Sequence, residues 1–412
     1  MRRVAVTGAG VVSPLGITLH EFHDSLIEGR SGIRRLAPEI TERSGVQVGA
    51  TIDWNPAGLF KEAEAANLDR VAQFALTAAG QAITESGLLA DAAAPRERIG
   101  VSWGTGMGGA HTTEASYKQV YGAGEWRVRP LTVVMGMANA AGSNVAVRHG
   151  LRGPFGNYST ACSSSAMALG EAMRAIAYGR ADAMIAGGSE ALLVPGVLVA
   201  WQALRTLAPA DAANPAASCK PFDKRRGGLV LGEGAAAFML EEESRARARG
   251  AKIYALLTGY GNSCDAVHMS RPDRDGQVRA MREALAESRL SPQDIGYINA
   301  HGTATAVGDV VEAEAINAVF GAAARDVWVS STKSLHGHLL GGSGALEFAA
   351  ALLALDRGIL PPTAFLEQPD PACALRHVAR RAERTDPPRA VMSNSFAFGG
   401  SNVVLLAERF TQ

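Results

Sequence analysis

One structural plan occurs twice along the chain: a short apolar strand, a tight turn rich in serine or glycine, and an alanine-rich apolar helix. In the first copy the turn 160–165 leads into a helix predicted over 166–178. In the second copy a strand over 327–331 leads through the glycine-punctuated turn 337–344 into a helix over 345–355. Strands that alternate with apolar helices are typical of an α/β fold. A chain of 412 residues also exceeds the size at which a single core stops growing. We therefore expect two fused, similar α/β halves.

Two apolar segments with a glycine turn and an acidic end support this repeat. Residues 229–241 predict paired strands, and residues 394–408 follow the same plan near the C-terminus. The most charged junction of the chain, 242–252, lies between them. Charged, polar junctions are common at domain boundaries. We expect an N-terminal half over residues 1–250 and a C-terminal half over residues 251–412.

Charge and cysteine usage exclude several functional classes. The 40 basic and 40 acidic residues give a formal net charge of zero, so nucleic acid and anionic membranes are not expected partners. The four cysteines, Cys162, Cys219, Cys264 and Cys373, show no CxxC spacing, which argues against a zinc ribbon or a disulfide framework. The apolar run 191–201 is too short to span a bilayer. These features predict a soluble protein in the reducing cytoplasm.

Cys162 stands at the N-terminus of the first predicted apolar helix. Unpaired backbone N–H groups and the helix dipole favour a thiolate there, which can lower the pKa of a cysteine well below the usual ~8.5. This position predicts a nucleophile. A buried structural cysteine is the alternative, because free cysteines in long apolar chains are commonly buried.

Two histidines of the second half follow predicted strands or glycine-rich turns, His301 and His338. Such positions deliver side chains to a crevice, and with a helix-cap cysteine they favour a site that activates a nucleophile. His336-Gly-His338 also resembles a metal-binding pair, but no acidic or cysteine ligand lies at metal-like spacing, so no metal is expected. The opening Thr7-Gly-Ala-Gly10 lacks the third glycine of a dinucleotide fingerprint, because Ser13 stands there. We expect no cofactor.

Four ordered motifs resemble the beta-ketoacyl-acyl-carrier-protein synthases, most closely the elongating, type II enzymes. They are Thr160–Ser165, His301–Thr305, Ser331–Gly341 and Asn394–Asn402. The likeness covers essentially the whole chain. It implies the thiolase fold, in which two fused similar halves form a five-layered α-β-α-β-α sandwich, usually within a dimer.

The resemblance implies an acyltransferase that performs a decarboxylative Claisen condensation, with Cys162 as the acyl acceptor. His301 and His338 would hold the thioester oxygen of a malonyl unit on acyl carrier protein while carbon dioxide leaves, and the product would be a 3-oxoacyl thioester. Two imidazole N–H donors can stabilise that oxygen without a metal. Lys333 and Glu347 match a family pair that supports the histidines electrostatically, and a purely structural ion pair is the alternative.

The family also implies an oxyanion hole and a gated acyl pocket. The backbone N–H groups of Cys162 and Phe398 would form the oxyanion hole. Met107 and Phe398 would gate the pocket, which in the family is often closed by side chains of a partner subunit near residues 131–132. Neither residue there is aromatic in this chain, so we expect room for medium or long acyl groups.

Acyl carrier protein is the partner that the resemblance implies. Because the carrier is acidic and this chain has no net charge, docking needs a local basic surface. The predicted docking residues are Arg127, Arg129 and Arg205, with Arg225 and Arg226 in nearby loops and Lys61 and Arg70 as weaker candidates.

Departures from the family pattern leave the pathway open. His336, Ala397 and Gly227 stand where the family commonly has Thr, Gly and Asp. The product could therefore belong to fatty acid or to polyketide or polyene biosynthesis.

Three related classes fit the sequence less well. A thiolase would need a second reactive cysteine in the C-terminal motif, which begins at Asn394 and has none. A chain-initiating synthase would pair its cysteine and histidine with asparagine, whereas His338 fills that place. A non-catalytic chain-length subunit would lack Cys162. The chain could still be the catalytic half of a ketosynthase/chain-length-factor heterodimer, so both homodimer and heterodimer stay open.

Overall fold

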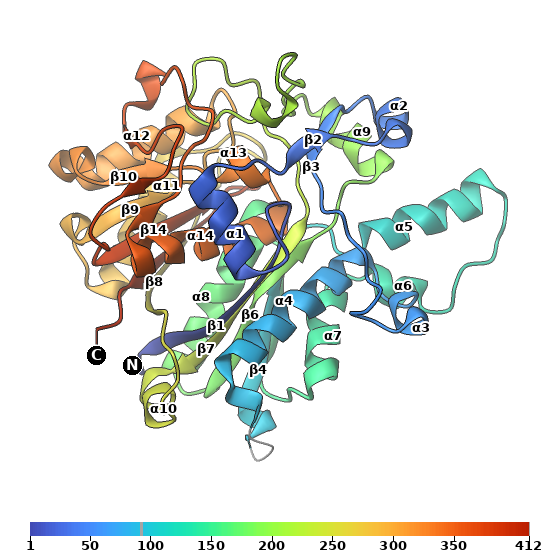
Figure 1. Ribbon diagram of the computed structural model, residues 1–412, viewed down its shortest axis with the longest axis horizontal. Coiled ribbons are helices and arrows are strands. Elements are labelled where there is room, and N and C mark those ends of the chain that lie inside the picture. The colour runs from blue at the N-terminus through green and yellow to red at the C-terminus, as the bar shows by residue number, and fades with distance from the viewer. Residues whose placement is uncertain (91–93, 412) are drawn as a thin grey trace.

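The strands of the computed structural model, which describes residues 1–90 and 94–411, build one mixed sheet of eleven strands (Figure 1). In sheet order they are β12 (Arg376–His377), β10 (Trp328–Ser330), β9 (Ile295–Asn299), β14 (Ala390–Phe396), β15 (Ser401–Glu408), β8 (Ala255–Cys264), β1 (Val4–Val12), β7 (Gly234–Glu242), β6 (Ala183–Glu190), β4 (Ile99–Gly104) and β5 (Phe155–Tyr158). Two short two-stranded ribbons, β2 (Ile33–Arg35) with β3 (Val48–Ala50) and β11 (Ile359–Leu360) with β13 (Glu383–Arg384), lie outside it.

The two halves of the sheet have the same topology. In the first half the order is β5-β4-β6-β7-β1, and in the second it is β10-β9-β14-β15-β8. Within each half the first three strands in this order are parallel, and the last two each run antiparallel to the strand before. Antiparallel pairing of β1 with β8, in which Val4 faces Leu257, joins the halves. The internal repeat predicted from the sequence is confirmed.

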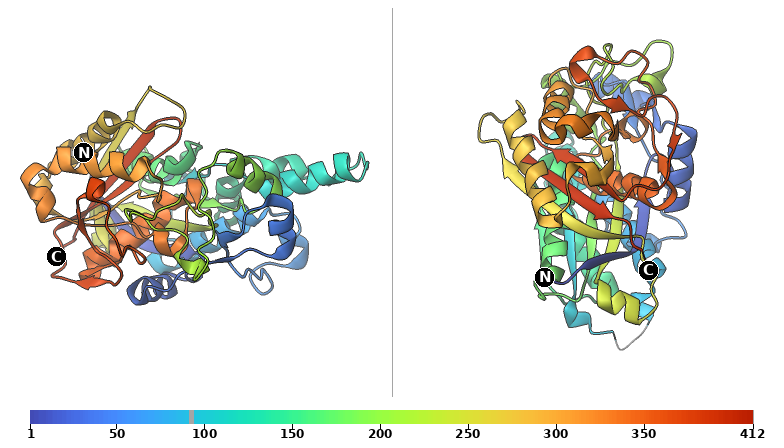
Figure 2. Two further views of the ribbon diagram at one scale, coloured as in Figure 1. Left: turned by 90° about the horizontal axis from the view of Figure 1, so that it is seen from above. Right: turned by 90° about the vertical axis from the view of Figure 1, so that its left-hand side faces the viewer.

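Helices form three layers around the two half-sheets (Figure 2). The long helices are α4 (Arg70–Ser86), α7 (Ala140–His149), α8 (Ser164–Ala177), α11 (Arg274–Ser288), α12 (Gly308–Phe320) and α14 (Ser343–Arg357). Helices α8 and α14 share one buried core with strands of both halves, so they are the central layer. The outer layers are α4 and α7 on the first half and α11 and α12 on the second. This arrangement is the five-layered sandwich expected from the sequence.

Shorter helices cover the rim of the sandwich. They are α1 (Leu19–Glu28), α2 (Pro38–Ser44), α3 (Glu62–Ala65), α5 (Ala110–Tyr117), α6 (Thr132–Gly136), α9 (Pro195–Ala203), α10 (Glu243–Ala248) and α13 (Lys333–His336). Helix α5 and the chain that follows it project from the body of the molecule (Figures 1 and 2). None of the helices in the described ranges combines the length and apolar character needed to cross a bilayer.

The prediction of paired strands over 229–241 is wrong in its first part. Only β7 is a strand of the sheet, whereas Leu229 and Leu231 make single bridges to Leu207 and His338. Ala50 also donates its N–H to the carbonyl of Leu231 at 2.8 Å. Because the backbone groups of Leu229 and Leu231 bind residues of separate loops, this segment links those loops and does not pair with β7 as a hairpin.

The predicted boundary at 250/251 lies between the two repeats. The first ends with β7 at Glu242, and the second begins with β8 at Ala255, with α10 between them. One continuous sheet crosses this junction through the pairing of β1 and β8. The division into two domains stays a prediction.

Candidate active site

Cys162 lies in a single 3-10 turn, η4 (Ala161–Ser163), directly before helix α8. Strand β5 ends just upstream, at Tyr158. The turn is tight, with Ala161 at a positive φ of 50°. Its shape is held by Ser164, whose hydroxyl accepts the Thr160 N–H at 2.9 Å and donates to the Ala161 carbonyl at 2.7 Å. The predicted position of Cys162 at a helix N-terminus is therefore seen, and its side chain is buried.

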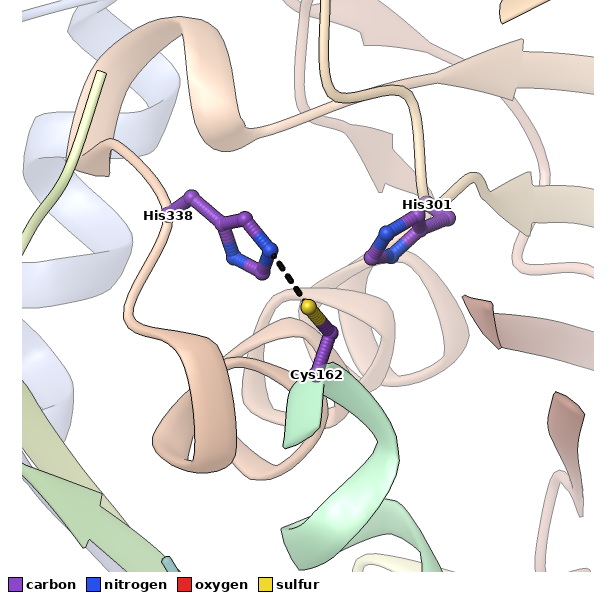
Figure 3. Close-up of side chains that lie close together, drawn as sticks. All are labelled: Cys162, His301 and His338. Carbon is purple, nitrogen blue, oxygen red and sulfur yellow. Dashed lines mark hydrogen bonds between the residues drawn. The ribbon is translucent and has the colours of Figure 1, made fainter. Parts of the chain in front are cut away.

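Three side chains from the two halves converge at this turn (Figure 3). His338 Nε2 lies 3.0 Å from Cys162 Sγ. The rings of His301 and His338 have centroids 5.4 Å apart and are inclined by 83°. One nitrogen of each ring and the sulfur lie within 4.8 Å of one another. The structure thus brings together the cysteine and both histidines that the sequence singled out.

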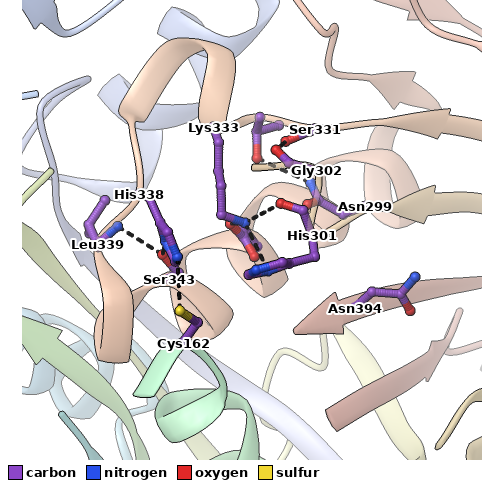
Figure 4. A network of polar contacts seen from close by, with 12 residues as sticks. Cys162, Asn299, His301, Gly302, Ser331, Lys333, His338, Leu339, Ser343 and Asn394 are labelled. Carbon is purple, nitrogen blue, oxygen red and sulfur yellow. Dashed lines mark hydrogen bonds and ion pairs between the residues drawn. The ribbon is translucent and has the colours of Figure 1, made fainter. Parts of the chain in front are cut away.

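His301 is positioned by a buried charged network (Figure 4). Glu312 accepts the N–H of His301 at 2.8 Å, which anchors the loop after β9. Lys333 Nζ donates to the His301 carbonyl at 2.6 Å and lies 3.4 Å from His301 Nδ1. Lys333 also forms a buried ion pair with Glu347 of α14. Because an ammonium group can only donate, Nδ1 of His301 accepts and the ring proton lies on Nε2.

His338 is held by its backbone and by one side chain. Its N–H donates to the carbonyl of Val230 at 2.7 Å, so the bridging segment before β7 fixes the loop. Its Nδ1 lies 2.8 Å from the hydroxyl oxygen of Ser343, the first residue of α14. The ring is almost completely buried. Nε2 is the nitrogen that faces Cys162.

Burial dominates the protonation of the site. It raises the pKa of Cys162 to about 12, against the lowering effect of the Lys333 charge and of a hydrogen bond from the Phe398 amide. The lowered thiolate pKa predicted from the helix N-terminus is therefore wrong in direction, because desolvation of the charged sulfur outweighs the lowering effects of Lys333 and of the Phe398 amide. Burial and the Lys333 charge lower the pKa of His301 and of His338 well below 6.5, so both rings are neutral at physiological pH.

A cavity of about 370 Å³ opens onto Cys162. Both histidines line it, together with Phe398, Trp201 and Arg205. The Phe398 ring stacks on Trp201 at a centroid distance of 5.9 Å and an angle of 20°. The predicted gate Phe398 therefore lies at the site, and its backbone amide lowers the pKa of the Cys162 thiol.

Met107 lies elsewhere. It is not among the residues that line this cavity, and its side chain is 45% exposed. Its amide donates to Glu190 Oε1 at 3.1 Å, so the Met107 turn is tied to the end of β6. The gating role of Met107 stays a prediction.

Sequence reasoning missed Glu190, a buried carboxylate that holds two loops of the site together. It accepts N–H groups from Gly106 at 2.6 Å and from Gly341 at 3.0 Å, besides that of Met107. Burial raises its pKa to about 7. The only signal in the sequence was its place at the end of a buried, glycine-rich strand. Ser343 was also missed, because a serine in a glycine-rich turn looks like an ordinary helix cap.

The rival interpretation of His336 and His338 as a metal-binding pair is not supported by the contacts of His336. Both nitrogens of His336 are occupied, Nδ1 by the Gly337 carbonyl at 2.8 Å and Nε2 by the Thr332 hydroxyl at 2.9 Å. Burial lowers the pKa of His336 to about 3. His336 is therefore a satisfied core histidine and not a partner of His338 in an HxH site.

The predicted docking arginines differ in how far their side chains are exposed to solvent. Arg127 and Arg129 are exposed on the projecting segment after α5, and Arg205 is exposed at the cavity. Arg226 contradicts the prediction, because its side chain is only 6% exposed and donates to Asp370 at 2.7 Å.

The remaining candidates are Arg225 and the two weaker ones, Lys61 and Arg70, and only one of the three is unpaired in the described residues. Arg225 forms hydrogen bonds with both carboxylate oxygens of Asp223, and Arg70 is paired with Glu233. Lys61 is exposed. Intramolecular pairing makes Arg225 and Arg70 poor docking residues.

Comparisons with known proteins cover the whole chain. Residues 1–246 match the family model "Beta-ketoacyl synthase, N-terminal domain", and residues 254–367 match "Beta-ketoacyl synthase, C-terminal domain". The chain is 39% identical to 3-oxoacyl-[acyl-carrier-protein] synthase 2 of Synechocystis over 99% of this chain and 98% of the relative. It is 41% identical to nodulation protein E of Rhizobium meliloti over 98% of each.

Solved structures agree with these sequence matches. A beta-ketoacyl synthase from Burkholderia phymatum superimposes with a TM-score of 0.93 at 34% identity, covering 100% of each chain. A ketosynthase of a type II PKS, solved in complex with its acyl-carrier protein, superimposes with a TM-score of 0.91 at 32% identity, again over 100% of each chain. On both kinds of comparison, the protein belongs to the beta-ketoacyl synthase family.

Proposed function

We propose that this protein is a 3-oxoacyl-acyl-carrier-protein synthase that elongates an acyl chain held on Cys162. In the first step the sulfur attacks an acyl thioester of the carrier, and the thiol proton leaves with the carrier thiol. In the second step malonyl-carrier loses carbon dioxide, and the resulting carbanion attacks the acyl-Cys162 carbonyl. The new C–C bond forms as the C–S bond to Cys162 breaks, and the released thiolate takes up a proton from solvent, which restores the thiol for the next turnover.

The observation that carries this proposal is the triangle of one cysteine and two neutral histidines within 4.8 Å. Decarboxylation leaves negative charge on the malonyl thioester oxygen, and two neutral imidazole N–H groups can stabilise it as donors. Burial lowers the pKa values of both rings, and the positive charge of Lys333 lowers them further, so both rings stay neutral. This is the role that we propose for the Lys333–Glu347 pair.

The condensation step also needs donors for a tetrahedral oxyanion. We assign the backbone N–H groups of Cys162 and Phe398 to this hole, where one donor typically contributes about 3 kcal/mol to transition-state stabilisation. The effect of the Phe398 amide on the pKa of Cys162 supports this assignment, because it places the amide near the sulfur.

Acyl carrier protein is the proposed partner, by analogy with the type II PKS ketosynthase that was solved with its carrier. Arg127, Arg129 and Arg205 are the proposed docking residues, since their side chains are exposed. We propose a cytoplasmic location on the basis of cysteine usage.

Dimerisation is proposed through the projecting segment around α6. Val133 and Val134 are 68% and 56% exposed, and Trp126 on the preceding loop is 79% exposed. Exposed apolar groups of this density mark protein interfaces. A second copy of this chain is the proposed partner there.

A ketosynthase/chain-length-factor heterodimer is the second candidate, because the ishigamide ketosynthase/chain length factor superimposes with a TM-score of 0.91. Light scattering of the protein purified alone separates the two. A stable dimer of about twice 42.9 kDa supports the homodimer, whereas a monomer or aggregate favours a missing partner chain.

The proposed chemistry is tested by intact-mass spectrometry with a panel of acyl-carrier thioesters. The wild type should gain the mass of the acyl group, and Cys162→Ala should gain none, because the thioester has no other attachment point. Cys162→Gln should lose condensation but keep malonyl decarboxylation, since both histidines remain. Acylation of the Cys162→Ala protein would refute the nucleophile. The panel also reports the preferred chain length, for which we propose medium or long acyl groups.

A further inference from the structure

The turn before α14 is built like the turn before α8. Each helix follows a 3-10 turn, η4 (Ala161–Ser163) or η8 (Leu340–Gly342), whose first residue has a positive φ, 50° for Ala161 and 43° for Leu340. The first residue of each helix is a buried serine, Ser164 or Ser343. Each serine hydroxyl accepts the N–H of the residue four positions earlier, at 2.9 Å in the first turn and 2.8 Å in the second. Ser164 and Ser343 are therefore equivalent positions.

The hydroxyls of Ser164 and Ser343 differ in the acceptor to which they donate a hydrogen bond. Ser164 donates to the carbonyl of Ala161 at 2.7 Å. Within residues 1–90 and 94–411, Ser343 Oγ makes only one other hydrogen bond, with His338 Nδ1 at 2.8 Å. A buried hydroxyl without an acceptor is costly, by about 1–3 kcal/mol. The Ser343 hydroxyl must therefore donate to Nδ1, which then carries no proton.

We propose that Ser343 is a positioning residue that keeps the proton of the neutral His338 ring on Nε2. A neutral imidazole has one N–H, so an acceptor role for Nδ1 makes Nε2 the donor. Nε2 faces Cys162 Sγ at 3.0 Å, where the malonyl thioester must also bind. Ser343 does for His338 what Lys333 does for His301, and the two rings present their N–H groups to the same point. This inference rests on the proposed function.

The test compares Ser343→Ala with Ser334→Ala as a matched control. Ser334 is also a buried serine of this region, but among the described residues its hydroxyl bonds only backbone groups, the Ser331 carbonyl at 3.1 Å and the Ala364 N–H at 3.0 Å. In Ser343→Ala, the kcat for malonyl-carrier decarboxylation should fall about tenfold, the size expected for loss of a hydrogen bond worth roughly 1.4 kcal/mol. The KM should stay within about twofold, because carrier binding is unchanged.

Two further readouts separate positioning from a general loss of structure. Ser343→Thr keeps the hydroxyl and should recover most of the lost kcat. Transfer of the acyl group to Cys162, followed by intact mass, should slow less than decarboxylation in Ser343→Ala, because attack by the sulfur does not need the Nε2 proton. Ser334→Ala should keep the kcat of the wild type.

Nuclear magnetic resonance of the protein labelled with ¹⁵N-histidine observes the proton directly. In the wild type, the His338 signals, assigned by their loss in His338→Ala, should show an unprotonated Nδ1 and a protonated Nε2. A protonated Nδ1 in the wild type, or equal kcat values for Ser343→Ala and Ser334→Ala, would overturn the inference. If the wild type is neither acylated nor able to release carbon dioxide, the proposed function itself fails.

Discussion

The turns that precede α8 and α14 share a backbone conformation but differ in the side chains that they bring to the site. At the second position of the first turn stands Cys162, and the same position in the second turn is Gly341. A Cβ atom on Gly341 would lie 2.2 Å from the Gly106 N and 2.5 Å from the Thr105 carbonyl carbon. The second turn is packed against the chain after β4, so it has no room for a side chain. The polar side chains that this turn region contributes to the site are therefore those of His338 and Ser343, which lie on either side of Gly341 in the sequence.

This difference explains why a duplicated architecture yields one active site. The first half contributes Cys162, the proposed nucleophile, and the second contributes the histidines, Lys333 and Glu347. The loop contacts of Gly341 are reinforced by Glu190 of the first half, which accepts the Gly341 N–H. Each half therefore supplies part of the one active site. Three substitutions test the difference between the two turns.

The largest effect is expected from Gly341→Ala. Its methyl group would meet backbone atoms of residues 105 and 106, which have no flexible end to move aside. We expect loss of roughly 3 kcal/mol or more in the free energy of unfolding, at the upper end for overpacking, and loss of decarboxylation with it. Urea denaturation measures this change.

Gly80→Ala is the matched control, because a Cβ there meets nothing within 4 Å and the position lies inside helix α4. That variant should be as stable as the wild type or more stable by about 0.5–1 kcal/mol. If Gly341→Ala unfolds at the same urea concentration as the control, the second turn has room after all, and the proposed contrast between the turns is wrong.

An effect of comparable size on stability is expected from Lys333→Met. It would leave the fully buried Glu347 without its counterion, and breaking a buried pair typically costs about 3–5 kcal/mol. It also removes the donor to His301, so decarboxylation should fall more than acylation of Cys162. Urea denaturation and the two kinetic assays measure these effects.

The double variant Lys333→Met, Glu347→Leu separates stability from chemistry. With no unpaired charge it should regain much of the lost stability but none of the lost decarboxylation, because the donor to His301 is still missing. Recovery of decarboxylation in the double variant would mean that Lys333 and Glu347 are only a structural pair.

At neutral pH the smallest effect concerns His336, because its contribution appears only as the pH falls below 6.5. Its pKa falls from 6.5 to about 3 on folding because the ring is buried. The unfolded chain therefore binds more protons below pH 6.5, so the stability that neutral His336 contributes is present above that pH and is lost as the pH falls toward 3. In His336→Thr, this part of the acid sensitivity should disappear.

The measurement is the free energy of unfolding between pH 7 and pH 4. The wild type should lose up to about 1.4 kcal/mol per pH unit relative to His336→Thr. His20→Thr, which replaces an exposed histidine in the same way, is the control. Parallel curves for the wild type and His336→Thr would contradict a buried neutral ring.

Patterns that are local in the chain were sufficient for much of the fold. The repeated plan of strand, turn and helix predicted the two halves, and the hairpin over 394–408 is present as β14 and β15. The positions of Cys162, His301 and His338 after strands or in glycine turns predicted that they would meet. Such features are readable because hydrophobic periodicity and turn chemistry act over a few residues.

Only the tertiary structure decided the pKa values, the exposure and the hydrogen-bond partners of the residues in and around the site. Burial raises the pKa of Cys162 where the sequence predicted a lowered value, and it encloses the Arg226 side chain. Hydrogen bonds to neighbouring groups occupy both nitrogens of His336. Glu190 binds backbone groups more than 80 residues before it and about 150 residues after it, which no local pattern reveals. Desolvation and hydrogen-bond partners depend on which distant segments pack together, and for that reason the sequence determined which residues meet, whereas the packing decided which of them carries each proton.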